Sequence, residues 1–153
     1  MTKALLLLVV LVARADAQNG AGWTLDVPEH LDLAVGATGT LPIAIAVDPG
    51  QTISKDGGIV LDLAPEPGIA VRRKRLTRAD AVDPDDAAPR FAVPLRADAT
   101  GDFAVKLHLR FWLCGTKVCK PIDARRSVTV SVSAAAPPPA PPPPDAGVPP
   151  KKR

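Results

Sequence analysis

Hydrophobic and polar residues alternate along most of the chain between residues 18 and 133, with the period of two that is typical of half-buried β-strands. In the longest run, residues 103–113, every second residue is apolar. Shorter alternating or continuously apolar runs cover residues 31–35, 41–47, 59–63, 69–76, 91–95 and 128–132. Turn sequences rich in proline, glycine and aspartate separate these runs, and no segment has a helical period.

Seven or so short strands in about 115 residues predict an all-β fold, an immunoglobulin-like antiparallel β-sandwich. The chain has 153 residues, which leaves room for one such domain between two ends of different composition. We therefore expect a single domain over residues 18–133.

The two ends of the chain depart from the strand pattern. Lys3 precedes an apolar stretch over residues 4–13, and small residues up to Ala17 match the cleavage site of a secretory signal peptide. We expect a signal peptide over residues 1–17, cleaved after Ala17, because about ten apolar residues are too few to span a bilayer. Residues 134–153 are rich in proline and end in three basic residues, so we expect a disordered tail there.

The net charge of the chain comes from these two ends. The formal net charge is +3. Lys3 and Arg14 against Asp16 account for one unit, and the three terminal basic residues against Asp145 account for two, so residues 18–133 are neutral. A neutral domain is not expected to bind nucleic acid.

Cys114 and Cys119 are the only cysteines, and they lie between the run that ends at Leu113 and the last strand. Four residues separate them, so a hairpin loop would place them opposite each other on antiparallel strands, within reach of a disulfide. Closing so short a loop stabilises a fold by only about 2 kcal/mol in the chain-entropy model. The spacing leaves two interpretations open, a small structural staple and a redox centre, and export to an oxidising compartment permits both.

Phe111 and Trp112 precede the first cysteine, and Pro121 follows two positions after the second. With these residues, the segment around the cysteines resembles the end of the N-terminal periplasmic domain of DsbD-type thiol:disulfide interchange proteins, and the order of runs over residues 40–133 is also similar. The resemblance implies a periplasmic immunoglobulin-like domain that passes reducing equivalents to exported proteins, as one component of a protein-disulfide reductase. It also makes Phe111, Trp112 and Pro121 supporting residues of the site.

In that family the second cysteine forms the mixed disulfide, which implies that Cys119 is the exchanging sulfur and Cys114 the resolving one. Lys117 and Lys120 flank the pair and would favour a thiolate, while solvated loop lysines are the simpler interpretation. The implied partners are periplasmic thioredoxin-fold proteins and a separate membrane electron donor. The alternative function is a non-catalytic envelope interaction domain in which the disulfide is structural.

No cofactor or metal site is expected. His30 and His108 lack ligand spacing relative to the cysteines, and the chain has no haem, nucleophile-elbow or phosphate-loop motif. The four consecutive basic residues 72–75 interrupt an apolar run, which is typical of an edge strand protected against pairing. A partner-docking patch is the alternative interpretation of this basic run.

Overall fold

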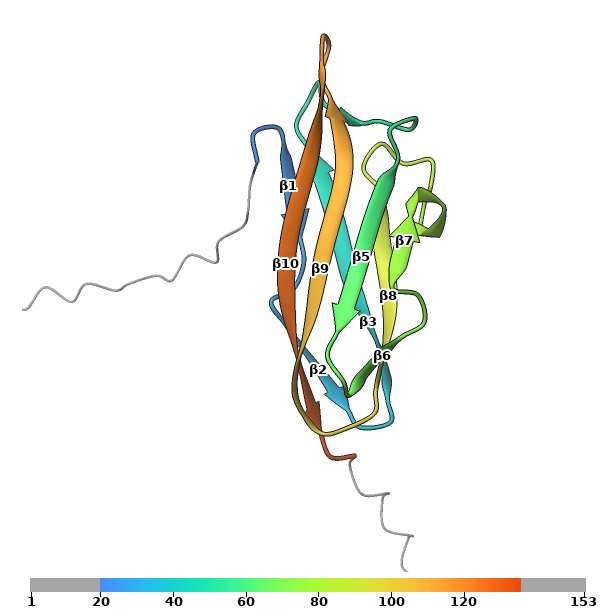
Figure 1. Cartoon of the computed structure of the whole chain (residues 1–153), viewed down its shortest axis with the longest axis vertical. Coiled ribbons are helices and arrows are strands. Elements are labelled where there is room, and N and C mark those ends of the chain that lie inside the picture. Colours follow the sequence, from blue (N-terminus) through green and yellow to red (C-terminus); the bar gives the residue numbers. More distant parts are fainter. Residues whose placement is uncertain (1–19, 136–153) are drawn as a thin grey trace, which may run out of the picture.

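The computed structural model describes residues 20–135 of the chain. Within them lie ten strands and one 3₁₀ helix (Figure 1): β1 (Trp23–Asp26), β2 (His30–Ala34), β3 (Thr38–Val47), β4 (Thr52–Ile53), β5 (Ile59–Pro65), β6 (Ile69–Val71), β7 (Arg75–Thr77), η1 (Arg78–Asp80), β8 (Arg90–Ala97), β9 (Gly101–Cys114) and β10 (Cys119–Ser133). No helix in this part of the chain is long and apolar enough to cross a membrane. The predicted signal peptide and residues 136–153 of the predicted tail lie outside the described residues.

The strands form two sheets that pack face to face, which confirms the predicted all-β, immunoglobulin-like sandwich. Sheet A has the strand order β1-β3-β8-β6. Sheet B has the order β2-β10-β9-β5-β7, and β4 pairs with β9 in addition. In Figure 1, sheet B lies in front, with β10, β9 and β5 crossing over β3 and β8 of sheet A.

One strand pair departs from the predicted antiparallel arrangement. β2 pairs with β10 in parallel, so that Leu31 lies opposite Val130 and Leu33 lies opposite Val132. The preceding strand, β1, instead pairs with β3 of sheet A. The chain therefore changes sheets between β1 and β2, which ties its first strands to both layers of the sandwich.

Alternation along the strands builds an apolar core between the sheets. In β8 every second residue from Phe91 to Ala97 is buried, and in β9 the same holds from Val105 to Leu113. No polar or charged residue is buried among residues 20–135. Each large apolar side chain removed from water stabilises the fold by about 1.5–3 kcal/mol, so the spacing predicted from the sequence is also what holds the sheets together.

The apolar run at residues 69–76, predicted as one strand, is divided in the structure. β6 pairs with β8 in sheet A, whereas β7 pairs with β5 in sheet B. Residues 72–74 cross between the layers, because consecutive charged side chains leave no residue to bury there. The edge strand predicted over residues 72–75 is therefore not formed as such: only Arg75 of the four basic residues lies in a strand, β7, at the edge of sheet B. β1 and β4 are too short, at four and two residues, to show a period in the sequence.

Candidate functional site

The cysteine pair lies at the turn of the long hairpin formed by β9 and β10. Cys114 and Cys119 face each other across the two strands, as the spacing predicts. They form a disulfide, with Cα atoms 3.9 Å apart. The Gly115 N–H donates a hydrogen bond to the Val118 carbonyl at 2.9 Å and closes the turn between them. The disulfide thus joins two strands at the place where the backbone turn already brings them together.

The disulfide lies near the surface of the molecule. Cys114 is half-buried and Cys119 is exposed, and no side chain between them is buried. The tip of this hairpin extends beyond the neighbouring strands in Figure 1. The exposed Lys117 lies in the turn, and Lys120 Nζ donates to the Ala21 carbonyl at 3.2 Å. The two lysines that flank the cysteines are therefore surface residues, and one of them binds backbone.

The three other predicted supporting residues lie on opposite faces of the hairpin. Phe111 is buried in the core, edge-on to Trp23 with ring centroids 5.5 Å apart. Trp112 is 42% exposed and lies opposite Pro121 on the outer face. A Cβ added to Gly57 would lie 2.7 Å from Trp112 Cδ1, so the indole packs directly on that glycine. Phe111 thus stabilises the sandwich, while Trp112 and Pro121 are surface residues.

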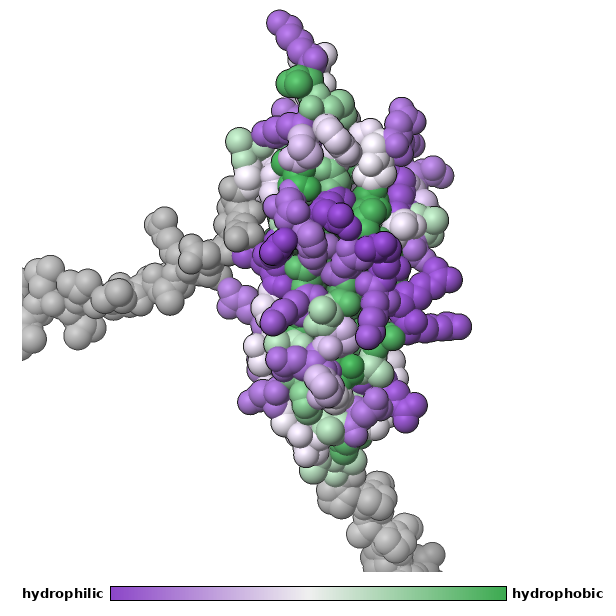
Figure 2. All heavy atoms as spheres, in the orientation of Figure 1, coloured by the Kyte–Doolittle hydropathy of each residue, from purple (hydrophilic) through white to green (hydrophobic). Residues whose placement is uncertain are grey.

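A second candidate region is the outer face of sheet B, where charged side chains lie in register across four strands. Asp62 of β5 lies opposite Arg75 of β7 on one side and His108 of β9 on the other. His108 in turn lies opposite Arg125 of β10. In Figure 2, hydrophilic residues form a band across the middle of this face. We use the term charged face for the side chains of Asp62, Arg75, Lys106, His108, Arg110, Asp123 and Arg125.

Asp62 connects its own strand, β5, with both neighbouring strands, β7 and β9. Its carboxylate accepts a hydrogen bond from Arg75 Nε at 2.6 Å and another from Arg110 Nη2 at 2.9 Å. The hydrogen bond from Arg75 is the main reason why the pKa of Asp62 lies below its ordinary value. Partial desolvation opposes this lowering of the pKa, and the hydrogen bond from Arg110 adds to it. Asp62 is therefore held as a carboxylate by two guanidinium groups.

Asp123 of β10, two strands away from β5, is also held by a neighbouring side chain. His108 Nε2 lies 2.8 Å from Asp123 Oδ2, and this hydrogen bond is the main cause that lowers the pKa of Asp123. Arg125 Nε is more distant, at 3.7 Å from Asp123 Oδ1. Lys106 makes no ion pair within residues 20–135. The two carboxylates are thus engaged, whereas Lys106 and much of Arg125 face solvent.

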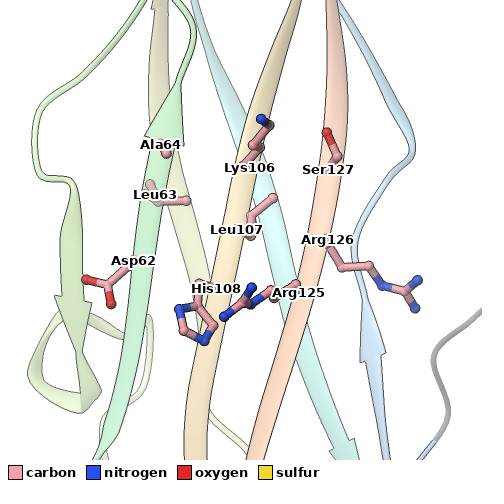
Figure 3. A pocket seen from close by; sticks show the side chains of 9 residues that line it. All are labelled: Asp62, Leu63, Ala64, Lys106, Leu107, His108, Arg125, Arg126 and Ser127. Carbon is pink, nitrogen blue, oxygen red and sulfur yellow. The ribbon is translucent and has the colours of Figure 1, made fainter.

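A hollow of ≈ 580 Å³ opens on the charged face beside Lys106 (Figure 3). Lys106 lies between Ala64 of β5 and Ser127 of β10 in the register of the sheet. Because alanine and serine are short, they leave open space on both sides of the lysine. The hollow is lined by Asp62, Leu63, Ala64, Lys106, Leu107, His108, Arg125, Arg126 and Ser127.

The two histidines of the described chain bind aspartates rather than one another. His30 Nε2 lies 2.9 Å from Asp32 Oδ1, and His108 is bonded to Asp123 as described above. Residues 20–135 contain no group of three or more histidine, cysteine or acidic side chains that could hold a metal ion.

Sequence reasoning singled out the cysteines and the basic run at residues 72–75, and it missed the charged face. A partial signal exists in the sequence, since residues 106, 108 and 110 alternate with buried leucines and valine as polar positions of one strand. Asp62 and Arg125 join them only through the strand order β5-β9-β10, which the sequence pattern does not give.

No family model and no curated protein matches the chain. Among solved structures, it is similar to AggA, the major subunit of aggregative adherence fimbriae type I from Escherichia coli, at 9% identity and a TM-score of 0.39, over 72% of this chain and 94% of that one. It is also similar to the CooA pilin subunit from enterotoxigenic Escherichia coli, at 14% identity and a TM-score of 0.33, over 73% of this chain and 99% of that one.

These matches are fimbrial subunits and not DsbD-type proteins, so the resemblance inferred from the cysteine segment is wrong. The predicted function, thiol:disulfide exchange, is therefore wrong. The predicted thioredoxin-fold partners and membrane electron donor depended on that function and have no other support. The physical reason is that the cysteine motif is not specific. Any two cysteines that flank a four-residue turn in an antiparallel hairpin lie opposite each other and can form a disulfide.

Proposed function

We propose that this protein is a non-catalytic interaction domain of the cell envelope, in which the disulfide between Cys114 and Cys119 is a structural staple. The observation that supports this is the absence of any buried side chain from residue 114 to residue 122. Packing therefore does little to hold the tip of the hairpin, and a hairpin without tertiary burial is only marginally stable in water. A disulfide at the base of the turn supplies a restraint that packing does not.

The proposal places the domain, residues 18–133, in the periplasm after export. The sequence supports export through Lys3, the apolar residues 4–13 and the small residues up to Ala17. A disulfide suits an oxidising compartment such as the periplasm. Residues 134–153 would then follow the domain as a proline-rich tail.

The charged face supports the interaction role. Lysine and aspartate are poor strand formers, yet β5, β9 and β10 carry such residues at outward positions in the middle of sheet B. Threonine or valine would suit these strands better, so the fold itself does not require charge there. A face that is charged beyond what folding needs is the kind of surface that a partner recognises.

The staple is tested by removing both cysteines together, in the chain without residues 1–17. We expect Cys114→Ala combined with Cys119→Ala to lower the free energy of unfolding by about 2 kcal/mol, because the denatured chain gains the freedom of an open loop. Urea unfolding followed by circular dichroism measures the change, and the far-ultraviolet spectrum should stay that of a β protein.

Val118→Ala is the matched control in the same turn, because Val118 is 70% exposed. It should change the free energy of unfolding by no more than about 0.5 kcal/mol. If the protein without cysteines unfolded at the same urea concentration as the parent, the disulfide would not be a staple and the proposal would fail.

A further inference from the structure

We propose that the charged face binds an extended acidic segment of a partner polypeptide, whose carboxylates are received by Lys106 and Arg125. This inference deepens the interaction role proposed above and rests on it. It assigns a surface and a partner chemistry to that role, and three observations on the described residues carry it.

The first observation is a local surplus of positive charge. The charged face has four permanent cations, Arg75, Lys106, Arg110 and Arg125, and two carboxylates. Residues 18–133 are neutral as a whole, so this surplus of two is a property of the face and not of the domain. Acidic partners are steered to such a patch and are repelled less there than elsewhere on the surface.

The second observation is that two of the four cations are paired with a carboxylate at hydrogen-bond distance and the other two are not. Arg75 and Arg110 both donate to Asp62, at 2.6 and 2.9 Å, so each of these guanidinium groups is already paired with a carboxylate of the sheet. Arg125 has only a 3.7 Å contact with Asp123, and Lys106 makes no ion pair within residues 20–135. A guanidinium and an ammonium with open donors are the groups that bind incoming carboxylates.

The third observation is the shape of the surface beside these two cations. The hollow of ≈ 580 Å³ opens around Lys106, between the short side chains of Ala64 and Ser127 (Figure 3). Glutamate and aspartate carry their carboxylates on short stems, so they can enter this hollow and reach Lys106 from above the sheet. The Ser127 hydroxyl lines the same hollow and can donate a further hydrogen bond.

The composition of the face favours a polypeptide over a nucleic acid or an anionic polysaccharide. Asp62 and Asp123 lie inside the charged face, where they would oppose a partner with a dense and uniform negative charge. No phenylalanine, tyrosine or tryptophan lines the hollow, whereas nucleic-acid bases stack on exposed aromatic platforms. Trp112, which is exposed, lines a different hollow with Pro121 and Gly57. A polypeptide can space its carboxylates to avoid the two aspartates.

The test uses a fluorescently labelled peptide in which glutamates alternate with serines, so that its carboxylates are spaced, and the chain without residues 1–17. Binding is followed by fluorescence anisotropy in buffer of low ionic strength. The variant Lys106→Glu with Arg125→Glu should bind the peptide at least about tenfold more weakly than the parent. The matched control is Arg90→Glu with Arg96→Glu, which changes the net charge equally on strand β8 of sheet A. It should stay within about twofold of the parent, because its charges lie on the other sheet.

Equal weakening in both double variants would show that only net charge matters, and it would overturn the proposal. Absence of binding to the parent chain, or much tighter binding of a sulfated polysaccharide than of the peptide, would overturn it as well. If the Lys106 and Arg125 reversal does not fold, Lys106→Gln with Arg125→Gln replaces it, with a smaller loss of the same sign expected. The disulfide experiment above measures stability alone, so its outcome and this one can fail independently.

Discussion

The outer faces of the two sheets differ far more than their inner faces do. Inward, both sheets present large apolar residues, and Leu41 of β3 in sheet A is as completely buried as Leu109 of β9 in sheet B. Outward, the middle of sheet A presents small uncharged residues such as Pro42, Ala44 and Ala92. The middle of sheet B presents the charged face instead, which appears as the hydrophilic band in Figure 2.

This difference separates what folding requires from what it leaves open. Burial fixes the inner faces, because an apolar side chain is stabilised wherever it leaves water. The outer positions need only be compatible with a strand and with solvent. The middle of sheet A meets that requirement with alanine, proline and threonine, and Arg90 and Arg96 lie near the two ends of β8. The fold does not require the charges of sheet B, which is why we propose a recognition role for them, and the comparison can be tested on each side.

The largest expected effect tests whether the inner faces of the two sheets contribute equally to the stability of the core. Leu41→Ala and Leu109→Ala should each lower the free energy of unfolding by about 2–5 kcal/mol, because each leaves a cavity in a core from which water is excluded. Urea unfolding measures both losses. Thr40→Ala and Lys106→Ala, at exposed outward positions of the same two strands, serve as controls and should change the free energy of unfolding by no more than about 0.5 kcal/mol. A large loss in only one of the two sheets would show that the core is not shared equally.

The sequence predicted the inner faces well and the outer arrangement poorly, for a physical reason. Alternation of apolar residues is a local signal, so runs such as residues 103–113 and 41–47 indicate strands and their buried sides directly. The charged face depends on which strands become neighbours, and Asp62 meets His108 across 46 positions of the chain. The basic run at residues 72–75 broke the local pattern, and one predicted strand became two strands in different sheets.

The cysteines also show that a local sequence pattern predicts local geometry but not function. Their spacing correctly predicted a cross-strand pair at a hairpin turn, because that geometry depends on only six consecutive residues. The same spacing could not distinguish a staple from a redox centre, because the two share one geometry. The residues that carry the resemblance to DsbD-type proteins are explained by local packing instead. Phe111 is part of the core, and Trp112 packs on Gly57.

A smaller effect is expected from Asp62→Asn, which breaks the link between β5 and its two neighbours. The loss in the free energy of unfolding at neutral pH should be no more than about 1 kcal/mol, because both guanidinium partners are partly exposed. The pKa of Asp62 is lowered in the folded protein, so its contribution is complete above the unfolded pKa of about 4 and is lost as the pH falls further. When the pH is lowered from neutral to about 3, the free energy of unfolding of the variant should therefore fall by less than that of the parent.

Asp56→Asn is the matched control for this pH experiment, because Asp56 is exposed in a turn and makes no ion pair within residues 20–135. Urea unfolding at a series of pH values compares the three proteins. Parallel pH curves for the parent and for Asp62→Asn would contradict the assigned role of the ion pairs with Arg75 and Arg110.

The most direct test of the account is a comparison of where an acidic peptide binds with and without the disulfide. Amide chemical shifts of the ¹⁵N-labelled chain would be followed during titration with the peptide of alternating glutamate and serine, for the parent and for the variant without cysteines. We predict that the shifts change on β5, β9 and β10 around Asp62, Lys106 and Arg125, and that both proteins show the same set. Changes centred on the tip near Cys114 and Cys119, or their loss in the folded variant without cysteines, would contradict the account.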